Sequence, residues 1–143
     1  MVGYVRKFIY FLFALCVMGI VIRPIFAFSG GPPLFHTGSP DDGYVTCNVA
    51  GCHNSFNLNS GTATFSISAP SNYTLGGVVS LTVSFNNSNT PKHGFQLSAL
   101  DANYNHVGSL SPVDNKTQAQ TVDNRYISHT LGGTDEASWT VQW

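Results

Sequence analysis

The stretch VSLTVSF, residues 79–85, alternates large apolar side chains with serine and threonine at every step. An alternation with period two places the apolar side chains on one face of an extended chain, so it predicts a half-buried β-strand. The same alternation recurs in further stretches, residues 62–69, 95–100, 125–131 and 137–143, and a short strand is expected around 107–110. Strands this short, at this close a spacing, predict an all-β fold with about six strands, an antiparallel β sandwich.

Clusters of Gly, Asn, Asp, Ser and Pro separate these stretches and predict turns. We expect such turns at residues 86–91, 101–105 and 132–135, and we expect residues 112–123 to be a polar connection without a strand.

The composition excludes several classes of protein. Charged residues make up 9% of the 143 residues and aromatic residues 13%, which does not fit a long helical bundle. After residue 28 the chain has three basic residues against seven acidic ones, a net charge of minus four. A chain with so few basic residues is not expected to bind nucleic acid.

The first 28 residues resemble an export segment. Arg6 and Lys7 precede the apolar run of residues 8–22, and Arg23 follows it. This order predicts a secretory signal peptide, with an uncleaved membrane anchor formed by residues 8–28 as the alternative. We therefore expect the remaining chain to lie in the periplasm or outside the cell, and Cys16 to belong to the export segment alone.

Residues 29–59 are rich in Gly, Pro, Asn and Asp and show neither a helical nor a strand period. A loop of this length is usually functional or flexible, and this one contains both cysteines of the mature chain, Cys47 and Cys52. We therefore divide the chain into an export segment (1–28), a loop (29–59) and a β domain (60–143).

The loop contains the motif CNVAGCH, in which Cys47 and Cys52 are four residues apart and His53 follows directly. The signature of c-type haem attachment is Cys-x-x-Cys-His, where the two thiols bind the porphyrin and the histidine binds the iron. Here the spacer is two residues longer, and Gly51 supplies backbone freedom. From spacing alone, a Cys47–Cys52 disulfide is almost as good an explanation, because such bonds are common in exported domains. A zinc site or two unpaired thiols are weaker alternatives.

The mature chain resembles the bacterial reeler-like domains of the choice-of-anchor V type along nearly its whole length. The similarity lies in residues 30–33, 37–40, the loop from Cys47 to Ser55, residues 94–100, residues 126–130, and the pattern Trp139-x-Val141-x-Trp143. In that family the corresponding loop usually has the spacing Cys-x-x-Cys-His and precedes an immunoglobulin-like sandwich, and members continue beyond the tryptophan pair.

The resemblance implies an exported monohaem cytochrome-like domain for electron transfer. One haem c would be attached through Cys47 and Cys52, with His53 as the proximal ligand and another protein as the redox partner. The alternative is a structural or adhesion module with a Cys47–Cys52 disulfide. No catalysis and no small-molecule substrate are expected, because the pair Asp135 and Glu136 lies in a turn and no serine has the context of an activated nucleophile.

A second axial ligand of the iron would have to be a histidine, since Met1 and Met18 both lie in the export segment. His129 alternates with Ile127 and Leu131, so by itself it suits a core histidine. Because the resemblance includes a Tyr-x-x-His element matched by residues 126–129, we expect His129 to be the second ligand, ahead of His36 and His93. His106 is expected to be a solvated surface residue.

The last strand places Trp139, Val141 and Trp143 on one face with no sequence after it to cover them. We therefore expect an incomplete domain that exposes an apolar patch and tends to associate.

Overall fold

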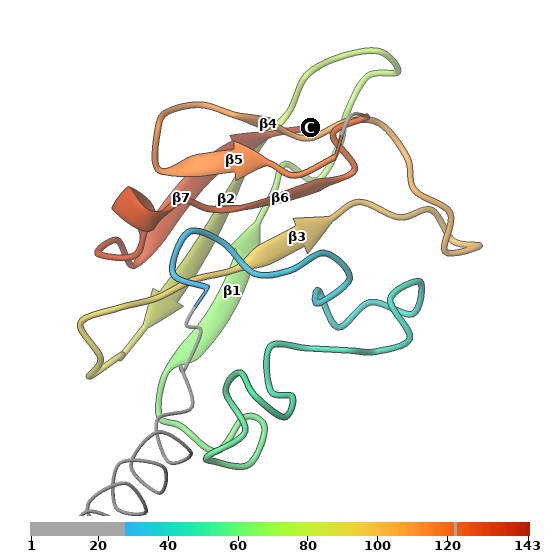
Figure 1. Cartoon of the computed structure of the whole chain (residues 1–143). Helices are drawn as coiled ribbons and strands as arrows, with labels where there is room; N and C mark the ends of the chain where they lie inside the picture. Colours follow the sequence, from blue (N-terminus) through green and yellow to red (C-terminus); the bar gives the residue numbers. More distant parts are fainter. Residues whose placement is uncertain (1–27, 122) are drawn as a thin grey trace, which may run out of the picture.

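The computed structural model describes residues 28–121 and 123–143 (Figure 1). In these residues the regular structure is β, apart from the short 3-10 helix η1 (Leu131–Gly133). The strands are β1 (Thr64–Ser68), β2 (Ser80–Asn86), β3 (Gln96–Ser98), β4 (Ser111–Pro112), β5 (Thr117–Ala119), β6 (Tyr126–His129) and β7 (Ser138–Gln142). The expected all-β class is confirmed. The predicted export segment lies outside the described residues except for Phe28, and none of the described helices could cross a bilayer.

The strands form two antiparallel sheets, with the orders β1-β2-β7-β4 and β3-β6-β5. In the larger sheet Val83 pairs with Trp139, and Leu81 pairs with Val141. Because β2 and β7 both alternate apolar and hydroxyl side chains, this register places their apolar side chains on the same face.

The two sheets share one hydrophobic core. It consists of Val83, Trp139 and Val141 from the larger sheet, Ile127 from the smaller one, and Phe95 and Leu110 from the adjoining segments. Burial of an aliphatic side chain such as Ile127 stabilises the fold by roughly 1.5–3 kcal/mol.

The apolar face of β7 is covered, so the expectation that its tryptophans lack a partner is wrong. Trp139 is 3% exposed, its ring centroid lies 4.9 Å from that of Phe95, and its Nε1 donates to the carbonyl of Gly133 at 3.0 Å. Trp143 is half-buried, and its Nε1 donates to the carbonyl of Val107 at 2.7 Å. The connections between strands, which the sequence pattern could not place, cover both indoles.

Two strand predictions are wrong. Residues 107–110 form no strand, because Leu100 bridges His106 and then Gly108, at a φ of 63°, turns the chain away. Residues 112–123 were expected to be a connection, yet they contain β5 and the last residue of β4. The sequence pattern did not reveal β5 because its residues are polar. Thr117 is buried although it is polar, and Gln118 lies next to it.

The edge strand β1 is less well covered than its neighbours. Phe65 pairs with Phe85, and Ile67 pairs with the buried Val83, so both side chains lie on the core side of the sheet. Phe65 is nevertheless 48% exposed and Ile67 49% exposed. β1 therefore contributes no residue to the buried hydrophobic core.

Candidate functional site

A short hairpin leads the chain into the cysteine motif. Thr37 bridges Thr46, and the amide of Gly38 donates to the carbonyl of Val45 at 2.7 Å. Gly38 has a φ of 76°, a conformation that glycine adopts at little cost. Since Cys47 follows Thr46 directly, the hairpin determines where the motif begins.

The motif closes on itself through its own backbone. The amide of Cys52 donates to the carbonyl of Val49 at 3.0 Å, and Gly51 has a φ of 86°, as the third residue of a type II turn requires. The amide of His53 donates to the carbonyl of Cys47 at 3.1 Å. The turn takes up the extra length of the four-residue spacer, so the two cysteines and the histidine lie on one compact loop.

Both cysteines of this loop are free thiols, with Cys47 half-buried and Cys52 exposed. Burial, together with the neighbouring Cys52, raises the pKa of the Cys47 thiol. An ordinary thiol is already mostly protonated at neutral pH. Cys47 therefore remains protonated there, which makes it a poor nucleophile.

The imidazole of His53 is exposed and lines an open hollow of about 440 Å³. The other lining residues are Asn48, Phe56, Asn57, Leu58, Asn59, Ser60 and Gly61. Phe56 is 81% exposed and Leu58 57% exposed. The histidine thus lies beside unburied apolar side chains and several amides.

The hydrogen bonds of residues 47–60 within the described part of the chain are all local. Besides those of the motif itself, the side-chain amide of Asn48 donates to the carbonyl of Phe56 at 3.1 Å, and the amide of Ser60 donates to the carbonyl of Asn57 at 3.2 Å. In Figure 1 this segment, coloured teal to green, extends to one side of the sheets. Its position therefore depends on the segment before it and on β1, which follows it.

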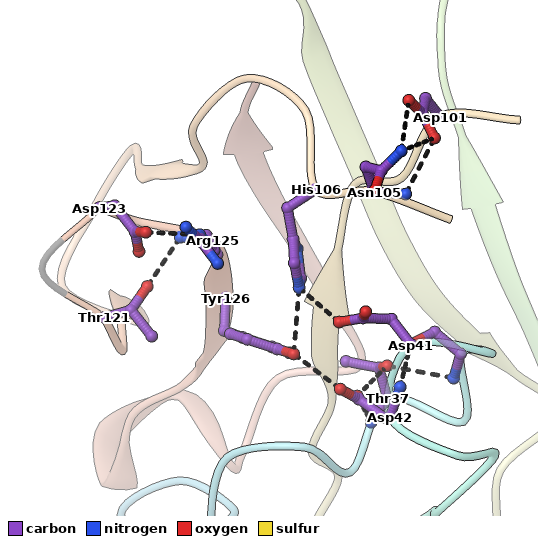
Figure 2. A network of polar contacts seen from close by, with 11 residues as sticks. Thr37, Asp41, Asp42, Asp101, Asn105, His106, Thr121, Asp123, Arg125 and Tyr126 are labelled. Atoms are coloured by element: carbon purple, nitrogen blue, oxygen red, sulfur yellow. Dashed lines mark hydrogen bonds and ion pairs between the residues drawn. The ribbon is translucent and has the colours of Figure 1, made fainter. Parts of the chain in front are cut away.

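That earlier segment is fixed to β6 by a buried carboxylate (Figure 2). Asp42, 7% exposed, accepts hydrogen bonds from the backbone amide of Thr37 at 3.0 Å, from the Thr37 hydroxyl, and from the Tyr126 hydroxyl at 2.6 Å. Burial would raise the pKa of Asp42, but these hydrogen bonds outweigh burial and lower it. The pKa of Tyr126 is strongly raised by burial and by the Asp42 carboxylate, so its hydroxyl keeps its proton.

His106 lies between the Tyr126 hydroxyl and a second carboxylate, that of Asp41 (Figure 2). Its Nε2 lies 2.8 Å from Asp41 Oδ2 and 3.3 Å from the hydroxyl of Tyr126. The sequence predicts a solvated surface position for His106, but its side chain is only 13% exposed. It helps to connect the hairpin to the smaller sheet.

Three glutamine side chains form hydrogen bonds with backbone carbonyls of residues 30–33, the segment before the hairpin. Gln96 and Gln120 donate to the carbonyls of Pro33 and Pro32 at 3.0 and 2.8 Å, and Gln118 donates to the carbonyl of Gly30. These glutamines and the Asp42–Tyr126 contact were not found from the sequence. One feature of the sequence could have indicated the glutamine contacts. Gln118 and Gln120 are two residues apart, so both lie on the same face of β5 or its extension.

His129 is placed in the core of the smaller sheet, away from the motif. It is 7% exposed, and its Nδ1 lies 3.0 Å from the amide nitrogen of Phe95, from which it accepts a hydrogen bond. Burial lowers its pKa, so the ring is neutral at physiological pH. The structure therefore brings Cys47, Cys52 and His53 together in one loop and does not place His129 among the residues that line the hollow.

Within residues 28–121 and 123–143, no group of three or more His, Cys, Asp or Glu side chains is arranged so that it could hold a metal ion. Comparisons with protein-family models, with curated proteins and with solved structures find no match to this chain.

Proposed function

We propose that this chain is an exported electron-transfer domain with one covalently attached haem c. Cys47 and Cys52 would form the thioether bonds, and His53 would be the proximal ligand. The observation that supports this most is the closed loop of residues 47–53, which combines two free thiols with an adjacent exposed imidazole. The site would act in the periplasm or outside the cell, and its partner would be another redox protein.

The four-residue spacer is compatible with this attachment. The Val49–Cys52 turn shortens the path between the thiols, and the bond from His53 to Cys47 brings the ends of the motif together. Phe56 and Leu58 add apolar surface next to His53 of the kind that a porphyrin face would cover.

The attachment chemistry balances without an oxidant. Each thiol adds across a vinyl double bond, so that sulfur bonds to one carbon, the thiol hydrogen goes to the other, and the double bond becomes single. The reaction needs reduced thiols, and a disulfide would prevent it. Once bound, haem supplies an iron that accepts and releases one electron. His53 would bind it through a ring nitrogen, and the loop would hold that ring beside the two sulfur atoms.

We further propose that the two sheets form an immunoglobulin-like sandwich in which the attachment loop precedes the first strand. The shared core of Val83, Ile127 and Trp139 supports this arrangement, and so does the antiparallel pairing throughout. The domain itself is proposed to have no catalytic activity.

Intact mass spectrometry of the exported protein tests the attachment. After denaturation and reduction, the wild type should keep the mass of one haem, and neither thiol should react with iodoacetamide. The double variant Cys47→Ser, Cys52→Ser should have no bound haem. In the variant His53→Gln both thioethers should remain, while the spectrum of the iron changes.

The opposite result would support the structural or adhesion module. If no porphyrin is present and the two thiols react with iodoacetamide only after reduction, the cysteines form a disulfide and the haem proposal is wrong.

A further inference from the structure

Strand β1 is the longest of the four edge strands, and it has none of the features that usually prevent pairing with another chain. The other edge strands are β3, β4 and β5. β3 and β5 have three residues each, β5 directly follows Lys116, and β4 consists of two residues, one of which is Pro112. Short strands, lysine and proline are common protections of a sheet edge. The five residues of β1, Thr64–Ser68, include no charged residue and no proline.

The hydrogen bonds between β2 and β7 show which way the backbone groups of β2 point. The amide of Phe85 donates to the carbonyl of Ala137 at 2.8 Å. The amide of Val79, just before β2, donates to the carbonyl of Trp143 at 2.8 Å, and the Trp143 amide donates back at 3.0 Å. The backbone groups of odd-numbered residues in β2 therefore point to β7. Since successive residues of a strand point their backbone groups to opposite sides, the even-numbered residues of β2 point to β1.

The same reasoning assigns the free edge of β1 to two residues. The even-numbered residues of β2 lie opposite Thr64, Ser66 and Ser68, so the backbone groups of these three point to β2. The amides and carbonyls of Phe65 and Ile67 therefore point away from the sheet. A second strand that pairs with this edge has to bind those four groups.

The sequence of β1, TFSIS, is complementary to itself in an antiparallel pair. When Ser66 lies opposite Ser66 of a second copy, Phe65 of each copy lies opposite Ile67 of the other. Each such pair exchanges two backbone hydrogen bonds, so this register satisfies all the outward amides and carbonyls of both strands. It also places an aromatic side chain beside a β-branched one, which is a favourable cross-strand pair. A contact of this kind has the two-fold symmetry of common homodimers.

The distribution of charge favours a second copy at this edge. Residues 43–91 contain no Asp, Glu, Lys or Arg, and β1 lies within this stretch. Because the chain after residue 28 has a net charge of minus four, its acidic surfaces repel those of another copy. Two copies that approach through β1 pair uncharged strands, and the exposed apolar side chains of Phe65 and Ile67 supply surface for the contact to cover.

We infer that two copies of this chain pair through β1, in the antiparallel register centred on Ser66. The four-stranded sheets of the two copies then form one continuous sheet of eight strands, four from each. The contact extends over five residues of each copy, so the dimer is reversible and forms as the concentration rises. The inference does not depend on the proposed haem attachment.

Single cysteines on the hydroxyl face of β1 test the register, in the full chain with its three native cysteines changed to serine. With oxidised glutathione, Ser66→Cys should form a disulfide-linked dimer. The two α-carbons of such a directly opposite, non-hydrogen-bonded pair are about 4.5 Å apart, which a disulfide can span. Thr64→Cys and Ser68→Cys are the matched controls. Each alone should lose the cross-link, whereas a mixture of the two should form it, because residue 64 lies opposite residue 68.

Amide hydrogen exchange tests the same contact in the wild-type chain. In dilute solution the amides of Phe65 and Ile67 should exchange rapidly, because they point away from β2. At high concentration both should become protected. The amide of Ser66, which points to β2, should be protected at both concentrations and is the internal control.

Three results would overturn the inference. Rapid exchange of the Phe65 and Ile67 amides at every concentration would leave the edge to a strand of a different protein. Protection of both amides in the monomer would show that another part of the chain covers the edge. Equal cross-linking of all three single-cysteine variants would show association without the register centred on Ser66. The exchange of the wild-type chain decides the question even if a variant fails to fold.

Discussion

The hydrogen bond from Tyr126 to Asp42 joins two residues 84 positions apart and fixes the hairpin that precedes the motif. Both partners are buried, with Tyr126 2% exposed and Asp42 7% exposed. A buried carboxylate that loses a donor bears a desolvation cost that nothing else offsets. Loss of this single contact is therefore expected to lower the stability of the fold.

We expect Tyr126→Phe to lower the free energy of unfolding by about 1–3 kcal/mol, because Asp42 would keep only its bonds from Thr37. Urea denaturation followed by tryptophan fluorescence measures the change. The matched control is Tyr104→Phe, whose side chain is 56% exposed, and which should unfold like the wild type. Equal unfolding midpoints for Tyr126→Phe and the wild type would show that the contact contributes nothing.

His129 should make stability depend on pH. Burial lowers its pKa, so the folded chain keeps the ring neutral while the unfolded chain takes up a proton near pH 6.5. The unfolded state then binds more protons, so the free energy of unfolding should fall as the pH drops below about 6.5 towards the lowered pKa of the folded state. Urea titrations between pH 8 and pH 5 should show a smaller fall in His129→Gln. Parallel curves for the two proteins would contradict this.

At the scale of residues, the sequence indicates Cys47, Cys52 and His53 as site candidates, because the motif lies within seven consecutive residues. It could not identify Asp42, since Asp-Asp-Gly is typical of any turn and its partner is far along the chain. His106 was misplaced for the same reason: only the folded chain brings Asp41 and Tyr126 to its ring.

Among the strands, β1 stands out because half of each core-facing apolar side chain is exposed. The residues are Phe65 and Ile67, on a strand that pairs on one side only. An exposed apolar edge is a template for pairing with another chain.

We expect Ile67→Lys to reduce self-association of the protein while changing its stability little, because a charge on this face opposes contact with a second apolar edge. Analytical ultracentrifugation over a range of concentrations measures the effect. Ser68→Lys, on the other face of the same strand, is the control and should associate more than Ile67→Lys does. If the two variants behave alike, the apolar face of β1 does not drive association.

The strands with clear alternation, such as β2 and β7, were predicted from the sequence, whereas the short strands β4 and β5 were missed. β2 and β7 were evident because valine, leucine and tryptophan alternate with serine and threonine. β5 was missed because its buried inner residue is Thr117, and β4 because two residues are too few for a period to show.

For the molecule as a whole, the structure divides into two sheets with one core and a peripheral segment, residues 47–61. The exposure of this segment, together with its purely local hydrogen bonds, implies a low cost of local opening.

Limited proteolysis should therefore cut first within residues 47–61 and leave residues 64–143 intact, because the strands are held by the core. Peptide mass fingerprinting over time identifies the sites. Under the proposed haem attachment, the loaded protein should be cut more slowly there than protein with both cysteines changed to serine. First cuts within β2 or β7 would contradict the division.

The contacts that position the hairpin have a consequence for the order of events during folding. The bonds from Gln118 to Gly30 and from Gln120 to Pro32 each span 88 residues, so they can form only after the smaller sheet exists. Until then the segment that contains the thiols is not held against the smaller sheet. An enzyme that modifies Cys47 and Cys52 during export would therefore act on a flexible peptide, and folding of the sheets would set the time available to it.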